Sequence, residues 1–236
     1  MDTTAFAAKG SQRWLQIAVA RAPGLLDVAL RSSGAIGECE TVTWGSPLAR
    51  EDFAEYRDRE ALRCLGILDL AKRSLIQFWP PRGPVWDALG VASGRAKILV
   101  EAKAHIAEAA SPGSKASEES LAHIRRSLEE ARAWYGPRAT ADWTGPLYQY
   151  ANRLAFHYLL SKLNGIPSRL VFLDFVNAED VGGPATEAEW AGATQLIHAL
   201  LGLPVDLRKF GVFHAYLDVG KLRAALEDIP PSRHNP

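Results

Sequence analysis

The sequence contains little cysteine and no arrangement that would link it. Cys39 and Cys64 are its two cysteines, and neither lies in a C-x-x-C pair or beside a histidine cluster. We therefore expect neither a disulfide framework nor a structural zinc site. Two unpaired thiols are typical of a reduced, cytoplasmic protein.

The sequence also lacks an excess of charge of either sign and any long hydrophobic run. Lys and Arg together number 27, and Asp and Glu together also number 27. This balance argues against general coating of nucleic acid, although it leaves room for a local basic groove. No apolar run approaches the length of a bilayer, and the start at 1–4 lacks the features of a signal peptide, so we expect no membrane partner.

Repeats and several well-known catalytic motifs are missing as well. The chain has no P-loop, no G-x-G-x-x-G after a strand, no H-E-x-x-H and no G-x-S-x-G. With 236 residues, of which 47% are apolar and 23% are charged, the chain can bury a sizeable core without disulfide bonds or structural metals. We expect a single domain over 1–236, with a helical extension over about 1–49.

Hydrophobic periodicity predicts helices before, between and after the strands, which indicates an α/β or α+β layer fold. Expected helices cover 11–30 with a possible break at Pro23-Gly24, 50–77 with a possible division at Gly66, 117–134, 147–163 and 187–201. Expected strands cover 40–44, 85–92, 96–105, 168–176 and 212–219. Three prolines in 79–84 predict a rigid, extended entry into the first strand of a hairpin.

The strongest chemical signal lies in the strand that contains Glu101 and Lys103. Alternate residues of a strand share one face, so these two side chains project together. The opposite face is apolar and small enough to pack under a helix, with Ile98, Val100, Ala102 and Ala104.

The loop Ser93-Gly94-Arg95 sets the register of this hairpin. A three-residue loop centred on Gly94 places Asp87 opposite Glu101, with their Cβ atoms about 4.5–5.5 Å apart. Two carboxylates this close repel each other, and a divalent cation such as Mg²⁺ or Mn²⁺ would relieve the repulsion. A two-residue turn would instead place Asp87 on the other face from Glu101.

Asp87, followed across a turn by Glu101-Ala102-Lys103, resembles the PD-(D/E)XK nuclease superfamily. Together with 83–90 and 148–153, these residues are similar to an uncharacterised bacterial family within it. The resemblance implies an α/β fold in which a central mixed β-sheet is flanked by helices, with a restriction-endonuclease-like core. It also implies a metal held by Asp87, Glu101 and the Ala102 carbonyl, and Lys103 assisting the attacking water. Trp86 stands where the namesake motif has proline.

Further residues enter as candidates around this motif. The resemblance implies an acid from the first core helix, for which Glu55 and Glu60 are both open, and a polar residue on the following helix, which Gln149 fits. Arg82 in the proline segment and His105 at the strand end are candidate substrate contacts. Asn152 and Arg153 share the polar side of the helix with Gln149. We expect this side to be solvated, and a functional role for it is the alternative.

The sequence therefore predicts a Mg²⁺- or Mn²⁺-dependent nuclease that hydrolyses phosphodiester bonds, with DNA ahead of RNA as its partner. Asp87, Glu101 and Lys103 are the expected catalytic residues. Two alternatives stay open: a non-catalytic binding protein that keeps the nuclease fold, and a metal-dependent phosphoesterase that acts on a small substrate. A basic groove leading to Asp87 would favour the nuclease, and a small closed pocket would favour the phosphoesterase.

Overall fold

A five-stranded mixed β-sheet forms the centre of the protein in the computed structural model, which describes residues 5–227. Its strands lie in the order β1-β2-β3-β4-β5, so each strand neighbours the next one in the chain. The first three strands form an antiparallel meander, and β4 and β5 continue the sheet in parallel with β3. The strands are β1 (Val42–Ser46), β2 (Ala88–Ala92), β3 (Lys97–Lys103), β4 (Ser168–Val176) and β5 (Val212–Asp218).

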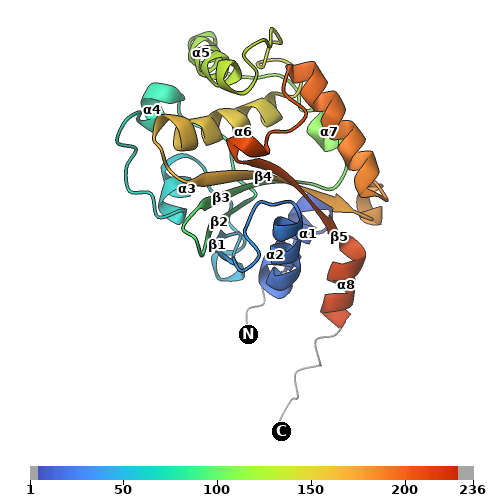
Figure 1. Cartoon of the computed structure of the whole chain (residues 1–236). Coiled ribbons are helices and arrows are strands. Elements are labelled where there is room, and N and C mark those ends of the chain that lie inside the picture. The colour runs from blue at the N-terminus through green and yellow to red at the C-terminus, as the bar shows by residue number, and fades with distance from the viewer. Residues whose placement is uncertain (1–4, 228–236) are drawn as a thin grey trace.

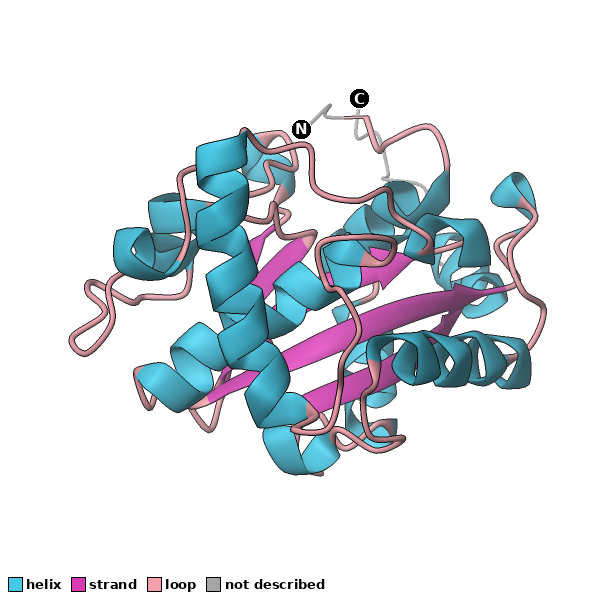
Figure 2. Ribbon diagram, turned by 90° about the horizontal axis from the view of Figure 1, so that it is seen from above, coloured by secondary structure: helices cyan, strands magenta, loops and turns pink. Residues whose placement is uncertain are grey.

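Helices cover both faces of this sheet, which gives three layers (Figure 1). One face carries α1 (Gly10–Arg21), α2 (Pro23–Ser32) and α8 (Val219–Glu227). The other carries α3 (Asp58–Cys64), α4 (Leu75–Phe78), α5 (Glu118–Tyr135), α6 (Tyr148–Tyr158) and α7 (Glu187–Leu201). Seen from above, the helices of this second layer lie over the strands (Figure 2). No helix within residues 5–227 combines the length and the apolar character needed to cross a membrane.

The hairpin of β2 and β3 has the register that a three-residue loop predicts. Leu89 pairs with Leu99, and the Ala92 N–H donates to the Ala96 carbonyl over 2.9 Å, which leaves 93–95 as the loop. Leu89 and Leu99 both enter the core beneath α6, whereas Ile98, Val100, Ala102 and Ala104 enter the core beneath α1 and α2. The prediction that Ile98, Val100, Ala102 and Ala104 share one apolar, buried face is confirmed.

Most of the expected elements are present, and two lie where they were expected: β4 and α7 match 168–176 and 187–201. The helix expected over 11–30 is two helices, because Pro23 begins α2 directly after α1. The residues 159–163 at the end of the expected helix 147–163 form a π-helical turn that follows α6. The last helix, α8, was not predicted.

The helical pattern over 50–77 is divided at Gly66, as expected, but most of the segment is not helical. Only α3 and α4 are α-helical within it, and Asp52, Phe53 and Asp58 adopt positive φ, which a continuous helix does not allow. Gly66 also has positive φ and ends α3. The apolar residues of this segment are spaced as in a helix, but they reach the core from short turns and loops.

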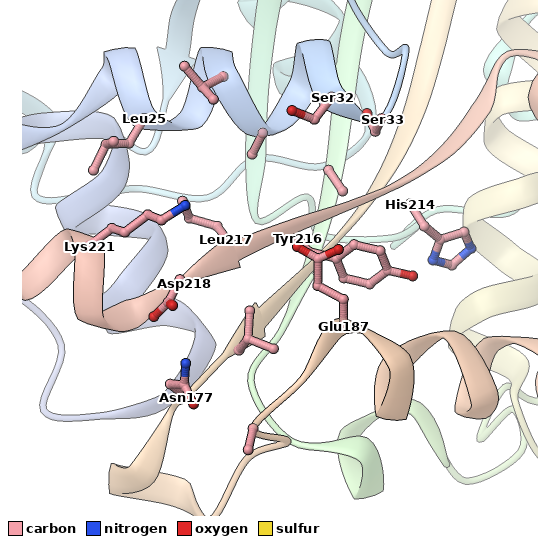
Figure 3. A pocket seen from close by; sticks show the side chains of 15 residues that line it. Leu25, Ser32, Ser33, Asn177, Glu187, His214, Tyr216, Leu217, Asp218 and Lys221 are labelled. Atoms are coloured by element: carbon pink, nitrogen blue, oxygen red, sulfur yellow. The ribbon is translucent and has the colours of Figure 1, made fainter.

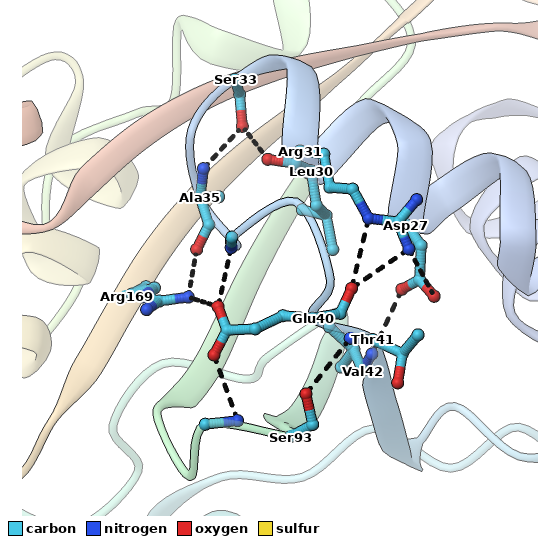
Figure 4. Close-up of polar contacts among 12 residues, drawn as sticks. Asp27, Leu30, Arg31, Ser33, Ala35, Glu40, Thr41, Val42, Ser93 and Arg169 are labelled. Carbon is cyan, nitrogen blue, oxygen red and sulfur yellow. Dashed lines mark hydrogen bonds and ion pairs between the residues drawn. The ribbon is translucent and has the colours of Figure 1, made fainter.

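Polar contacts fasten the hairpin loop to the rest of the sheet (Figure 4). The Glu40 carboxylate accepts hydrogen bonds from Arg169 Nη1 at 2.8 Å and from the backbone N–H groups of Gly37 at 2.7 Å and Gly94 at 3.1 Å. These contacts, led by the one from Arg169, lower the pKa of Glu40. One carboxylate thereby links β4, the hairpin loop and the segment before β1, which helps to fix the register of β2 and β3.

Candidate active site on strand β3

The pairing of β2 with β3 ends beside Asp87. The last paired residues are Ala88 and Val100, and two residues before Ala88, Trp86 forms an isolated bridge with Tyr56 instead. The backbone N–H of Ala102 is bonded by the Asp87 side chain, whose Oδ2 accepts it over 2.7 Å. Asp87 therefore lies where the two strands separate, at the position opposite Glu101.

Two cationic side chains hold Glu101. Arg153 donates from Nε to Glu101 Oε2 over 2.5 Å, and Lys103 Nζ bonds to Oε1 of the same carboxylate. Arg153 is itself fixed, because its Nη2 donates to the Val85 carbonyl over 2.7 Å and its guanidinium lies 5.0 Å from the centre of the Trp86 ring. Glu101 and Arg153 are both buried, so this ion pair is shielded from solvent.

The two carboxylates of the site respond differently to these surroundings. Burial, reinforced by the negative charge of Glu101, raises the pKa of Asp87 to about 8. Burial also opposes ionisation of Glu101, but Arg153 and Lys103 together outweigh it and lower the pKa of that carboxyl. Glu101 is therefore the ionised member of the pair, and Asp87 keeps its proton up to mildly alkaline pH.

Glu55 and Glu60 were the two candidates for an additional acid, and of these Glu55 interacts with the Glu101 charge. Burial raises the pKa of Glu55, and the charge of Glu101 adds to the shift. Gln12 donates to its carboxylate over 3.2 Å. Glu60 is exposed on α3. Glu55 lies in the loop before α3 rather than on a helix, which is why helical periodicity did not single it out.

The three expected substrate contacts have different surroundings. Gln149 lies at the site, because its Oε1 accepts from Lys103 Nζ over 3.2 Å. His105 caps the short turn after β3, where its Nδ1 accepts the Ala107 N–H over 3.0 Å. Arg82 is exposed, and its backbone N–H donates to Asp58 Oδ2 over 3.0 Å. Substrate binding by these three residues stays a prediction.

The prediction of a solvated polar side for α6 is wrong for Asn152 and Arg153. Both are buried, and Arg153 Nη1 donates to Asn152 Oδ1 over 3.0 Å. The sequence contains an arginine on a helix with no acidic neighbour in its own turn. Its partner, Glu101, lies on a strand about fifty residues earlier, which periodicity does not show.

A small cavity opens beside Lys103, with a volume of about 20 Å³. This volume suffices for one water molecule. Its polar walls are the side chains of Glu101, Lys103, Gln149, Asp174, Thr194 and His214, and its apolar floor includes Phe172. We call it the site cavity. Asp174 and His214 were not among the candidates, because only the parallel pairing of β3, β4 and β5 places them in the same rows as Lys103 and Glu101.

The donor set of this site suits a hard cation. Three acidic side chains, Glu55, Asp87 and Glu101, lie near two basic ones, Lys103 and Arg153, so the acids outnumber the bases here. Oxygen ligands of this kind are those that Mg²⁺ and Mn²⁺ prefer. Within residues 5–227, no three side chains of His, Cys, Asp or Glu already lie close enough together to hold a metal ion. Binding would therefore require these side chains to move.

Comparison with protein-family models, with curated proteins and with solved structures returns no match to this chain.

Proposed function

We propose that this protein is a metal-dependent nuclease that hydrolyses phosphodiester bonds, with DNA preferred over RNA. One observation carries the proposal: Asp87 and Glu101 directly adjoin the last paired residues of one hairpin, Asp87 Oδ2 accepts the Ala102 N–H, and Lys103 Nζ bonds to the Glu101 carboxylate. This is the arrangement that the resemblance to PD-(D/E)XK nucleases implies. The buried charges around Glu101 support it further, since strongly shifted carboxyl groups gather at functional sites.

Each side chain has a role in this proposal. Asp87, Glu101 and the Ala102 carbonyl would hold Mg²⁺, with Glu55 as an additional acid. The bound cation would polarise the phosphate and lower the pKa of a coordinated water. Lys103 would donate hydrogen bonds to the attacking water or to a phosphoryl oxygen as negative charge grows on it. Gln149 would hold the Lys103 ammonium in position through the hydrogen bond that it accepts.

The pairing of Glu101 with Arg153 favours a second candidate, a non-catalytic protein that kept this fold. An ion pair that occupies both oxygens of the carboxylate leaves the buried charge compensated without any metal. In the nuclease, the carboxylate must exchange part of this pairing for the cation. The two candidates therefore differ in whether Mg²⁺ binds and whether cleavage follows.

The test is a cleavage assay with labelled single- and double-stranded DNA and RNA in Mg²⁺, in Mn²⁺ and in EDTA. We expect cleavage that needs the metal and that falls at least about 10²-fold in Lys103→Ala. Lys97→Ala is the matched control, since Lys97 begins the same strand outside the site. Equal digestion by wild type and Lys103→Ala would contradict the proposal, and metal binding without cleavage would favour the non-catalytic candidate.

A further inference from the structure

We propose that the open edge of β5 binds an extended segment of a partner protein, in which apolar residues alternate with basic ones, as an added strand of the sheet. The proposal goes beyond the proposed function, because it concerns a second surface and depends neither on the metal nor on cleavage. It rests on the backbone groups at this edge, on the groove that surrounds them and on the charge of the groove walls.

The outer edge of β5 has no neighbouring strand within residues 5–227. β5 is the last strand in the sheet order and pairs with β4 alone. The Leu170 N–H of β4 donates to the Gly211 carbonyl over 2.9 Å, so the parallel register assigns the bonds with β4 to alternate residues of β5, beginning at Phe213. The backbone N–H and C=O groups of His214 and Tyr216 therefore point away from β4, where an added strand can pair with them.

A groove of about 390 Å³ surrounds this edge (Figure 3). All the residues of β5 from 214 to 218 line it. Because successive side chains of a strand lie on opposite faces, a hollow lined by all of them follows the edge of the strand rather than one face of the sheet. These residues extend over about 13 Å, which suits an added strand of similar length.

The two walls of the groove differ in chemistry. Helix α2 forms one wall and contributes the apolar side chains of Leu25, Val28 and Ala29, of which Val28 is 52% exposed. The start of α7 forms the other wall, where Glu187 lies near Tyr216. Side chains of an added strand would point alternately to these walls, so its apolar residues would face α2 and its polar residues would face α7.

The charge of the groove indicates that these polar residues are basic. Two acidic side chains, Glu187 and Asp218, line the groove, against Lys221 as the one lysine or arginine in its lining. Asp218 Oδ1 accepts the Gly220 N–H over 2.7 Å, and Oδ2 is then the oxygen available to a cation. A lysine or arginine of the partner would complement this excess of negative charge.

The same walls favour an isolated segment over a second copy of this chain. Figure 3 shows α2 on one side of β5 and the start of α7 on the other. The β5 edge of a second copy would bring its own α2 and α7 against these helices, whereas a single extended segment brings only its side chains. The occupant that we infer is therefore a strand-forming segment of another protein.

The experiment is fluorescence anisotropy of a labelled synthetic peptide that alternates valine with lysine, titrated with the full chain. We expect saturable binding with a Kd below about 1 mM, and binding at least about tenfold weaker for a peptide that alternates valine with glutamate. Val28→Arg places a charge on the apolar wall and should weaken binding at least about tenfold. Val205→Arg is the matched control, since Val205 is 79% exposed outside the groove, and it should bind as wild type does.

Backbone pairing has a separate readout, which uses the wild-type chain and so does not depend on the folding of any variant. N-methylation of one alternate set of peptide residues removes the N–H groups that face β5, and methylation of the other set removes N–H groups that face away. We expect one methylated peptide to bind at least about tenfold more weakly and the other to bind as the parent peptide does.

Three results would overturn the proposal. The first is no binding of the valine–lysine peptide up to about 1 mM, or equal binding of the valine–glutamate peptide. The second is the same response to both patterns of N-methylation. The third is a dimer of the wild-type chain in analytical ultracentrifugation that Val28→Arg dissociates and Val205→Arg does not, because a second copy would then occupy the edge. Absence of nuclease activity would overturn the proposed function and leave these results unchanged.

Discussion

Arg153 on α6 and Glu101 on β3 form a buried ion pair, with 2.5 Å between Arg153 Nε and Glu101 Oε2. Both side chains are at least 96% buried. The pair connects the helix layer to the strand that carries the candidate site. A buried charge that loses its partner is strongly destabilising, because nothing else compensates its lost hydration.

Replacement of Arg153 should therefore lower the stability of the fold and favour the protonated form of Glu101. We expect Arg153→Met to lower the free energy of unfolding by about 3–5 kcal/mol in urea titrations. The double variant with Glu101→Gln should recover a large part of this loss, since the buried carboxylate that had kept only Lys103 as a partner is then gone. Arg126→Met, at an exposed position of α5, serves as the control and should change stability by less than about 0.5 kcal/mol. A single variant as stable as wild type would show that the pair is not compensating a buried charge.

Asp87 predicts an unusual fall of stability with rising pH. Its pKa is about 8 in the folded protein, against 3.8 for an ordinary aspartate, so between these values the folded state binds a proton that the unfolded state has lost. The free energy of unfolding then decreases as pH rises, by up to about 1.4 kcal/mol per pH unit, and the decrease ends above pH 8. Urea titrations between pH 6.5 and 8 should show a loss of about 1–2 kcal/mol that Asp87→Asn removes. An identical slope in wild type and variant would contradict the assignment.

The prediction for metal follows from the same carboxylates. Mg²⁺ at a hundredfold excess over its dissociation constant should stabilise the protein by about 2.7 kcal/mol and raise Tm by about 5–10 °C. Calorimetry in two buffers of different ionisation enthalpy should detect proton release at pH 7, because the cation forces Asp87 to ionise. EDTA should reverse both effects.

Glu55 and Glu60 provide a matched pair for this measurement. Glu55→Gln should reduce the metal-induced rise in Tm, since that carboxyl lies within reach of the Glu101 charge. Glu60→Gln should leave the rise unchanged, since Glu60 is exposed on α3. The opposite ranking would place the additional acid on the helix.

His157 predicts the behaviour of the protein in acid. It is fully buried, with Nδ1 2.7 Å from the Tyr135 hydroxyl and Nε2 3.1 Å from the Ser168 carbonyl, and burial lowers its pKa to about 4. The unfolded state takes up a proton near pH 6.5 and the folded state only near pH 4, so stability is lost as pH falls through this window. The loss amounts to about 3 kcal/mol for this side chain. His157→Gln should flatten the acid limb of the stability curve in urea titrations, and an unchanged limb would contradict this origin.

Local signals were sufficient for the parts of the fold that neighbouring residues determine. The loop at 93–95 fixed the register of the hairpin, and a run of β-forming residues at 168–176 matched β4 because both faces of that strand are buried. The helix prediction for 50–77 failed because apolar side chains that enter the core from turns and loops can also have helical spacing. Positive φ at Asp52, Phe53 and Asp58 is set by tertiary contacts and leaves no periodic trace.

The residues of the candidate site also fall into those predicted by local signals and those placed by tertiary contacts. Asp87, Glu101 and Lys103 lie on one hairpin, so spacing alone was enough to group them. Arg153 and His214 join the site only through the packing of α6 and the parallel pairing of β5, which bring together residues far apart in the chain. A single sequence therefore predicts site residues that are close together in the chain, but not those that only the tertiary fold brings together.

The reverse side of β3 has a consequence for how the site evolves. Ala102 and Ala104 lie directly behind Glu101 and Lys103, and helix α1 packs against this strand. Both alanines are buried, so a bulkier residue at either position would overpack the core between β3 and α1. Substitutions on α1 can therefore shift β3 slightly and alter the spacing of Glu101 and Lys103, although neither of these two residues changes.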